Sequence, residues 1–465
     1  MEFTEYRFSE LLSNIVDNRG RTCPTAEQGI PLIATNCVKN DGLYPTWEKL
    51  RYVSKETYDE WFRGHPEPGD LLFVCKGSPG NVCWVPEPVP FCIAQDMVAI
   101  RADEQKVYPK YLFAVLRSED VQQKISNMHV GTLIPHFKKK DFASLFLQIP
   151  DDYGHQIKVG DFYYDFSSKI EVNKKENRIL EETAQALFKS WFVDFEPVKA
   201  KAAALEAGST AEDAERAAMQ AISGKSEAEL DSLKTENPDQ YESLGSTAAL
   251  FPSAMAESEL GGIPDGWHTE PLDSIAKYQN GLALQRYRPE NEDDYLPAVK
   301  IAQLRQGFAD GEEKASPNIK PECIIDNGDV VFSWSGSLMV DTWCGGKAAL
   351  NQHLFKVTSE RFPKWFYYYY TKHHLNQFQK IAADKAVTMG HIKREHLRQS
   401  MCVVPPAELL ASAESFLGTM LEKQITNRVE SGNLMEMRDA LLPKLLSGEL
   451  NISGTESDPA EAAEA

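Results

Sequence analysis

The sequence predicts an α+β protein with two similar domains, separated by two long helices that pair as an antiparallel coiled coil. Three observations lead to this fold class. Short apolar runs bounded by glycine and proline are typical of strands. The same sequence landmarks occur twice in the same order, which indicates an internal repeat. Each copy then ends in a long segment with apolar residues every three or four positions, as in a packed helix.

The composition is that of an ordinary globular protein. The chain has 465 residues, with 42% hydrophobic and 25% charged residues, enough for two or three domains. No run of eighteen apolar residues occurs, and the polar start "MEFTEYRFSELLSN" is unlike a secretory signal. None of the 8 cysteines forms a Cys-x-x-Cys pair, so no zinc module is indicated. We therefore expect a cytoplasmic protein with reduced thiols.

The acidic charge is unevenly distributed along the chain. The formal net charge is −20, which by itself argues against a nucleic-acid-binding protein. Residues 201–260, however, hold twelve acidic and four basic residues, and residues 451–465 hold four acidic residues and no basic one. These two stretches contribute −12, so the other 390 residues carry only −8 and include basic clusters. The net charge does not exclude DNA binding by the folded parts.

The repeat is visible in matched landmarks. The segment "GDLLFVCKGSPG" at 69–80 matches "GDVVFSWSGSLM" at 328–339 at an offset of 259. The segment "YPKYLFAVL" at 108–116 matches "FPKWFYYYY" at 362–370. Further pairs follow in order: Gln95 with Gln352, 132–142 with 388–397, Pro150 with Pro405, and Asn173 with Asn427. The drift between landmarks is only five residues, so the chain is interpreted as a tandem duplication.

Each copy is expected to contain strands followed by a helix. The runs "GDLLFVC" and "FCIAQDMVAI" in the first copy are predicted strands. The segment "PKYLFAVLRSEDVQQKI" is a predicted helix that opens at Pro109, and its counterpart opens at Pro363. Each domain is therefore expected to mix short strands and helices.

The long segment that closes each copy has a seam that is apolar at its ends and polar at its centre. Asparagine at the core of a coiled coil costs stability but fixes register and partner. The matched polar centres favour pairing of the two helices with each other over packing of each on its own domain. The first seam comprises Val159, Phe162, Phe166, Ile170, Asn173, Asn177, Leu180, Ala184, Leu187 and Trp191, and the second Phe416, Met420, Gln424, Asn427, Ser431, Leu434, Arg438, Leu441 and Leu445.

These patterns divide the chain into six parts. They are a first domain at 1–150, a central helical spacer at 151–197, an acidic linker of short solvated helices at 198–260, a second domain at 261–405, a C-terminal helical spacer at 406–450 and a disordered acidic tail at 451–465.

The sequence contains only incomplete versions of known catalytic, cofactor-binding and metal-binding motifs. "CGGKAAL" at 344–350 resembles a phosphate loop, but Ala348 stands where Ser or Thr would bind magnesium. His373 with His374, and His391 with His396, lack acidic or cysteine partners at metal-ligand spacing. No glycine-rich loop suited to a nucleotide or S-adenosylmethionine occurs in the sequence. We therefore expect a non-catalytic chain that holds no cofactor or metal.

A duplicated binding pattern remains. "HFKKKDF" and "HIKREHL" are basic segments at equivalent places that can contact phosphates, and polar loops of each domain can reach base edges. For any single residue, a solvated surface is the simpler interpretation, whereas the duplicated pattern favours DNA contact. The candidate DNA-binding residues are Lys76, Ser78, Asn81, Thr132, His136, Lys138, Lys139, Ser335, Ser337, Lys347, Thr388, His391, Lys393 and Arg394.

Four segments resemble the specificity subunit of type I restriction–modification enzymes. They are "NRILEETAQALFKSWFVDFEPVKAK", "SELGGIPDGW", "VTMGHIKREHL" and "MRDALLPKLLSGEL", and the resemblance covers the chain up to residue 450. It implies two target-recognition domains, each of which reads one half of a split, asymmetric DNA sequence. It also implies helical spacers that pair as an antiparallel coiled coil and hold these domains apart. The acidic tail departs from the family and has no family role.

The resemblance further implies partners and their cofactors. Two methyltransferase subunits would bring S-adenosylmethionine, and restriction subunits would bring ATP-dependent translocation and cleavage, with magnesium on these partner subunits. The apolar helix ends would be either core packing or a docking surface for the partners. These candidate partner-binding residues are Leu187, Phe188, Trp191, Phe192, Leu441, Leu442 and Leu445.

Two other functional classes compete with this interpretation. One is an enzyme with hidden motifs, which S-adenosylmethionine binding by the isolated chain would favour. The other is a coiled-coil scaffold, or a DNA-binding adaptor outside restriction, which measurement of duplex binding would separate from a specificity subunit.

Overall fold

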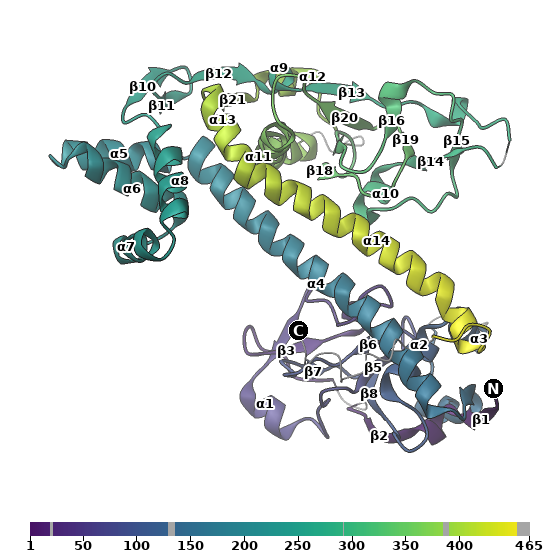
Figure 1. Cartoon of the computed structure of the whole chain (residues 1–465). Coiled ribbons are helices and arrows are strands. Elements are labelled where there is room, and N and C mark those ends of the chain that lie inside the picture. Colours follow the sequence, from purple (N-terminus) through teal and green to yellow (C-terminus); the bar gives the residue numbers. More distant parts are fainter. Residues whose placement is uncertain (19–21, 129–134, 292, 385–389, 453–465) are drawn as a thin grey trace, which may run out of the picture. The chain divides into compact units, whose positions relative to one another are not determined.

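The computed structural model describes residues 1–18, 22–128, 135–291, 293–384 and 390–452 of the chain (Figure 1). The chain divides into two compact units. Unit 1 comprises Met1–Val172 with Asn433–Ala465, and unit 2 comprises Asn173–Gly432. Thr132, Thr388 and the acidic tail from residue 453 lie outside the described residues.

Unit 1 contains three small sheets. The strand next to the N-terminus pairs antiparallel with the strand that precedes the long helix, and Phe3 lies opposite Pro150. The second sheet is antiparallel and has the order β2-β8-β5-β6, and the third has the order β4-β3-β7 with a parallel β3–β7 pair. The strands are β1 (Phe3–Arg7), β2 (Leu12–Val16), β3 (Ile30–Ile33), β4 (Arg51–Val53), β5 (Leu71–Val74), β6 (Val82–Trp84), β7 (Cys92–Ile93), β8 (Met97–Ala102) and β9 (Phe146–Pro150).

The helices of unit 1 pack on different sheets: α2 contacts β6 and β8 of the second sheet, and α1 packs on the third sheet through Tyr58. They are α1 (Lys55–Glu60), α2 (Pro109–Arg117), α3 (Glu119–Asn127), the first half of α4 (Tyr153–Phe192) and the second half of α14 (Thr419–Leu446). The sequence predicted one helix from Pro109, but the chain breaks at Ser118, whose extended backbone and side chain cap the start of α3. Gly160 permits close approach of α2 to α4, because a Cβ there would lie 2.6 Å from the Tyr111 amide nitrogen.

Unit 2 repeats the three sheets. A strand pair is formed by β12 and β21, the antiparallel sheet has the order β13-β20-β17-β18, and the last sheet has the order β15-β14-β19-β16 with a parallel β14–β19 pair. The strands are β12 (His268–Pro271), β13 (Lys277–Asn280), β14 (Leu296–Val299), β15 (Lys314–Ala315), β16 (Ile324–Ile325), β17 (Val330–Ser333), β18 (Met339–Thr342), β19 (Ala348–Leu350), β20 (Leu354–Thr358) and β21 (Met401–Val404). The equivalent strand orders confirm the duplication that the landmarks predicted.

The helices of unit 2 include the aromatic helix that follows the second sheet. They are α9 (Leu272–Ile275), α10 (Ile301–Gln306), α11 (Lys364–Ala383), α12 (Arg394–Gln399), α13 (Ala407–Ala413) and the first half of α14 (Thr419–Leu446), besides the second half of α4. A π-helical turn at Glu414–Gly418 joins α13 to α14. Trp365, Phe366, Tyr369 and Tyr370 of α11 are buried in the largest core of unit 2.

Along the chain, four helices and a hairpin follow α4 and precede β12, within unit 2 (Figure 1). Thr210 with Asp213, and Ser226 with Glu229, form capping boxes that start two of these helices. The sequence predicted short solvated helices here, but one face of them is packed, because Met219, Ile222 and Leu244 lie in the main core. The elements are α5 (Glu196–Glu206), α6 (Ala211–Ser223), α7 (Glu227–Glu236), α8 (Pro238–Ala249), β10 (Met255–Ser258) and β11 (Gly261–Pro264).

The long helices pair in antiparallel fashion, as the sequence predicted. In unit 2, Asn173 of α4 donates its side-chain amide to Glu430 Oε2 at 2.8 Å, and Asn427 of α14 donates to Glu176 Oε2 at 2.7 Å. Each helix therefore contributes the same Asn-x-x-Glu pattern to one reciprocal contact. Asn173 and Asn427 are fully buried, so this polar layer specifies one register.

The paired helix segments of unit 1 are held by different contacts. His155 Nε2 lies 3.0 Å from the carbonyl oxygen of Leu445. Arg438 is buried, donates to Ser167 Oγ at 3.2 Å, and lies over the ring of Tyr163. A polar centre and apolar ends are therefore present along the pair, as predicted.

The predicted seam is shifted by one position at four places, whereas Val159, Trp191 and Leu445 are buried as predicted. Tyr163 and Ser167 are buried where the sequence suggested Phe162 and Phe166, which are half-buried. Phe188 and Leu442 are likewise buried in place of Leu187 and Leu441. Adjacent large side chains can each satisfy a spacing of three or four residues, so periodicity alone does not decide which one enters the seam.

Candidate nucleic-acid interface

A group of loops in unit 1 gathers the polar residues that the sequence singled out. The loop that follows β5 pairs with the segment before the 3₁₀ turn at Lys139–Ser144: Lys76 and His136 form a β-bridge. The Phe137 amide donates to the Cys75 carbonyl at 2.8 Å, and the Gly77 amide donates to the Pro135 carbonyl at 3.2 Å. Residues 75–81, 95–96 and 135–139 are called loop cluster 1 below.

The segment after β7 completes loop cluster 1. The Asp96 carbonyl accepts hydrogen bonds from the amides of Cys75 at 2.9 Å and Lys76 at 3.2 Å. Gln95 and Asp96, together with Asn36 and Arg51, line a polar cavity of about 240 Å³ beside this segment. None of these four residues is among the DNA-binding candidates predicted from the sequence. The match of Gln95 with Gln352 in the repeat could have identified one of them.

Unit 2 builds the same arrangement from other side chains. Ser335 and His391 form the β-bridge that is equivalent to the one between Lys76 and His136. The Ile392 amide donates to the Trp334 carbonyl at 3.0 Å, and the Gly336 amide donates to the Gly390 carbonyl at 2.8 Å. Residues 333–338, 352–353 and 390–394 are called loop cluster 2 below.

A Gly-Ser turn is shared by both clusters and has a conformational reason. Gly77 has φ +92° and Gly336 has φ +68°, in a region that side chains with a Cβ rarely adopt. Ser78 and Ser337, which follow these glycines, are exposed at the turn. The repeated Gly-Ser landmark thus marks the same exposed loop in the two units.

The candidate DNA-binding residues differ in how freely their side chains face solvent. Ser335 is only 4% exposed, the side-chain amide Nδ2 of Asn81 donates to the Val38 carbonyl at 3.0 Å, and the Arg394 guanidinium donates to the Tyr278 carbonyl at 3.0 Å. Ser335 is therefore buried, and the side chains of Asn81 and Arg394 are hydrogen-bonded to the backbone of their own unit, which the sequence alone did not reveal. The exposed candidates are Ser78, Lys138, Lys139, Ser337, Lys347, Lys393 and Arg394, and the half-buried ones are Lys76, Asn81, His136 and His391.

Lys347 lies on a loop outside loop cluster 2. This loop joins β18 to β19 and is held by the Gly346 amide, which donates to Asn327 Oδ1 at 2.8 Å. The last three residues of "CGGKAAL" form the strand β19 instead of starting a helix, so the geometry of a phosphate loop is not present at this segment.

The charge of the clusters suits a polyanion. Lys138 and Lys139 are exposed on loop cluster 1, and Lys393 and Arg394 are exposed on loop cluster 2. Exposed cations on loops can contact phosphate oxygens, while hydroxyl and amide groups beside them can contact base edges. The arrangement can therefore position a nucleic acid and offer base-reading groups in each unit.

The helix ends are mainly packed inside the units. Phe188, Trp191 and Phe192 are at most 3% exposed and lie in the main core of unit 2. Leu442 and Leu445 are equally buried in the core of unit 1. For these five residues the geometry corresponds to core packing, one of the two alternatives that the sequence left open. Leu187 and Leu441 are half-buried at equivalent places and retain an accessible face.

The two histidines on α11 differ in exposure, since His373 is exposed and His374 is half-buried. Burial lowers the pKa of His374 to about 4, and its Nε2 lies 3.2 Å from the Met401 carbonyl oxygen. Within the described residues, no group of three or more His, Cys, Asp or Glu side chains could hold a metal ion. His374 therefore acts as a neutral side chain that ties α11 to β21.

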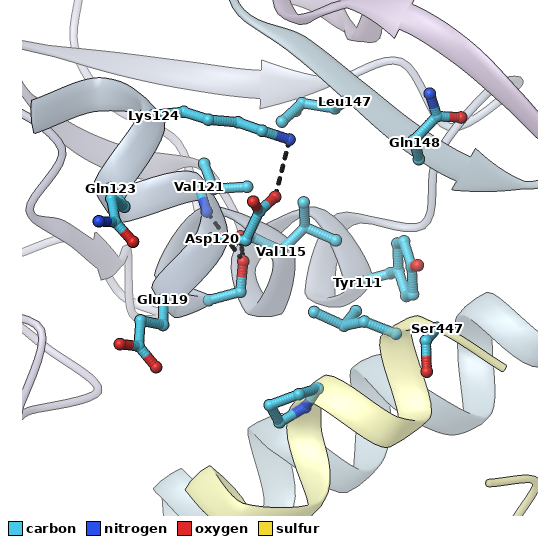
Figure 2. A pocket seen from close by; sticks show the side chains of 13 residues that line it. Tyr111, Val115, Glu119, Asp120, Val121, Gln123, Lys124, Leu147, Gln148 and Ser447 are labelled. Carbon is cyan, nitrogen blue, oxygen red and sulfur yellow. Dashed lines mark hydrogen bonds and ion pairs between the residues drawn. The ribbon is translucent and has the colours of Figure 1, made fainter. Parts of the chain in front are cut away.

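A cavity of unit 1 lies between α2, α3, β9 and the end of α14 (Figure 2). Its volume is about 490 Å³, and its walls include Tyr111, Val115, Leu147 and Leu446. Asp120 and Lys124 form an ion pair at 2.7 Å on one side. The lining combines aliphatic side chains with polar and charged ones, among them Glu119 and Gln148.

The chain is similar in sequence to DNA specificity subunits of type I restriction enzymes. A family model described as type I restriction modification DNA specificity domain matches twice, at residues 18–182 and 264–430. The HindI specificity subunit of Haemophilus influenzae is 30% identical over 82% of this chain and 86% of its own length. The MjaIX specificity subunit of Methanocaldococcus jannaschii is 23% identical over 74% of this chain and 70% of its own length.

A solved structure agrees on the fold. The S subunit of a type I restriction–modification system from M. genitalium has a TM-score of 0.53 and 13% identity, and the match covers 96% of both chains. Within the described part of the chain, no helix has the length and apolar character needed to span a membrane. The two matched domains cover well over half of the sequence, and the chain therefore belongs to the family of type I restriction–modification DNA specificity subunits.

Proposed function

We propose that this specificity subunit reads a bipartite, asymmetric duplex target, with loop cluster 1 on one half-site and loop cluster 2 on the other. One observation carries the proposal: the same three-segment loop arrangement is built twice on equivalent sheets, but with different side chains. Equal frameworks place equivalent contacts, whereas different side chains select different bases.

Phosphate contacts supply affinity in this proposal, and polar groups supply discrimination. Lys138, Lys139, Lys393 and Arg394 are the phosphate-binding candidates, because they are exposed at equivalent places. His136, His391, Ser78 and Ser337 sit beside them and are shared by the two clusters. Shared residues suit features that both half-sites have in common, and residues that differ suit the bases that distinguish the half-sites.

The partners in this proposal are two methyltransferase subunits and the restriction subunits. The reciprocal Asn-x-x-Glu contact between α4 and α14 gives the helix pair a local two-fold character, which supports two similar docking surfaces. Leu187 and Leu441 lie at equivalent positions and are half-exposed, so they are the candidate docking residues that packing leaves accessible.

Catalysis is assigned to the partners. We infer that S-adenosylmethionine, ATP and magnesium bind to the methyltransferase and restriction subunits and that this chain binds none of them. The two loop clusters support a binding role for this chain. The competing function is a coiled-coil scaffold, or a DNA-binding adaptor outside restriction, which would use the helix pair without methylation.

The test uses the purified chain alone and in complex with its methyltransferase subunits. We expect methyl transfer to a bipartite duplex from the complex and none from the chain alone, and DNA affinity that falls with salt according to the number of phosphate contacts. Methyl transfer by the chain after rigorous removal of partners would contradict the assignment. A complex that binds no duplex at low salt would favour the scaffold.

A further inference from the structure

We propose that Gln122 and Gln379 are matched positioning residues, each of which holds the reading loop of one unit in shape for its half-site. The inference rests on the proposed function of the two loop clusters. It concerns side chains on helices that do not belong to either cluster.

In unit 1, Gln122 joins α3 to the loop that follows β5. Its side-chain amide donates to the Gly80 carbonyl at 2.8 Å and to the Leu116 carbonyl at 2.6 Å. Gly80 is buried at the end of this loop, and its own amide donates to the Val74 carbonyl at 3.0 Å. Gln122 therefore fixes the side of the loop where the chain returns to the sheet.

In unit 2, Gln379 makes the equivalent contact from α11. Its side-chain amide donates to the Leu338 carbonyl at 3.1 Å. A cavity of about 450 Å³, lined by Gly336, Ser337 and Gln379 among others, lies between this loop and the helix. Leu338 itself is buried in the core that includes Phe378 and Ala382 of α11, so the Gln379 hydrogen bond adds a directional polar contact to this apolar packing.

Each loop is thus held on two sides. The far side is fixed by backbone hydrogen bonds, from Gly77 to Pro135 in unit 1 and from Gly336 to Gly390 in unit 2. The near side is fixed by the glutamine, and the exposed Ser78 or Ser337 lies between the two attachments. The offset from Gln122 to Gln379 is 257, within the range of 254 to 259 that the matched landmarks of the two copies span.

The equivalence gives the two contacts a common role. A loop that reads bases must be pre-organised, because a mobile loop loses both affinity and discrimination when it orders on binding. Removal of the amide donor leaves a partly buried carbonyl without its partner and frees one side of the loop. Gln122 and Gln379 act through the loop and are not expected to touch DNA.

The experiment uses the complex with its methyltransferase subunits, on the target that methylation mapping of the wild-type complex defines. Gln122→Met and Gln379→Met each remove the donor with little change in side-chain length. The readout is the ratio of methylation rates on the target and on duplexes with one base pair changed in either half-site. Gln123→Met is the matched control, because Gln123 is the exposed neighbour of Gln122 and lines the cavity beside α3 (Figure 2).

We expect Gln122→Met to lower discrimination about five-fold at one half-site only and Gln379→Met to do so at the other, the size expected for the removal of one hydrogen bond. Gln123→Met should match the wild type at both. If a Met variant fails to fold, the isosteric Gln122→Glu and Gln379→Glu take its place, since a carboxylate cannot donate to the loop carbonyl.

The outcomes separate the inference from the proposed function. If the wild-type complex methylates a bipartite target and the glutamine variants behave as Gln123→Met does, or weaken both half-sites equally, the positioning role is wrong. If the wild-type complex methylates no bipartite target, the proposed function itself fails. Half-site-selective loss that is reciprocal between the two variants supports the inference, because a general loss of stability would not divide in this way.

Discussion

The two units differ most where the long helices end against the sheet domains. In unit 2, Trp191 and Phe192 pack with Trp365, Phe251 and Trp267 in a continuous aromatic core. At the equivalent place in unit 1, Leu445, Leu446, Tyr111 and Val115 stand instead, and a cavity of about 490 Å³ remains beside them. The backbone framework is the same, yet the side chains that fill it are not.

This contrast teaches how a duplicated domain diverges. Strand order and the loop–loop bridges are carried by backbone hydrogen bonds, which tolerate changes of side chain. Core volume and loop surface then vary independently in each copy. Equivalent core positions hold Trp191 in one unit and Leu445 in the other. In the same way, equivalent positions of the loop clusters hold Lys76 and Ser335.

The strongest test of independence exchanges one domain. Replacement of residues 261–405 by the equivalent domain of a relative should change one half-site completely and leave the other intact, because each copy carries its own sheets and loops. Methylation mapping of cells with the chimera measures the target. Loss of both half-sites in a chimera that still folds would indicate one composite reading surface.

The aromatic core gives the largest expected effect of a point substitution. Trp191→Ala should lower the free energy of unfolding of unit 2 by about 3–5 kcal/mol, and Leu445→Ala, at the equivalent position, should lower that of unit 1 by about 2–5 kcal/mol. Hydrogen exchange resolved by segment measures each unit separately. If Leu445→Ala lowers the free energy of unfolding more than Trp191→Ala does, the aromatic core of unit 2 does not depend more on packing than the core of unit 1.

The polar layer of the helix pair should behave as a coupled pair. Asn173→Leu or Asn427→Leu alone should cost about 1–3 kcal/mol, since each leaves buried groups of the opposite helix unpaired. The double variant should cost less than the sum of the singles, because two leucines can pack together. Chemical denaturation of the four proteins gives the coupling energy, and strict additivity would show that the contact is not reciprocal.

The smallest effects are expected from the basic side chains. Alanine at Lys138, Lys139, Lys393 or Arg394 should reduce the magnitude of the salt slope of DNA binding by about 0.9 for each phosphate that the protein no longer neutralises. Discrimination between half-sites should not change. Lys364→Ala, which removes a cation paired with Glu422 outside the clusters, is the control. Wild-type salt dependence in all four variants would show that these cations are only solvated surface.

Much of the fold could be predicted from the sequence, because the repeat and the helical periodicity are local patterns. The polar centre at Asn173 and Asn427 predicted the pairing, and the burial of both residues agrees with it. Periodicity could not choose between Leu187 and Phe188, or predict the helix start at Ser118, where a capping side chain competes with helix continuation.

The loop clusters could be predicted only in part. The basic segments and the Gly-Ser turns were visible, but the meeting of Lys76 with His136, and of Ser335 with His391, depends on pairing between segments far apart in sequence. The same is true of four side-chain hydrogen bonds to backbone carbonyls distant in the sequence. Their donors are Asn81, Arg394, Gln122 and Gln379. Residue type in a loop does not reveal such partners.

The central claim, that one framework carries two independent readers, is tested most directly by methylome sequencing of cells with and without this gene. The account predicts that deletion abolishes methylation at one motif made of two different specific blocks separated by a spacer of fixed length and free sequence. Disappearance of a single continuous motif, or no change in methylation when the methyltransferase subunits are active, would contradict it.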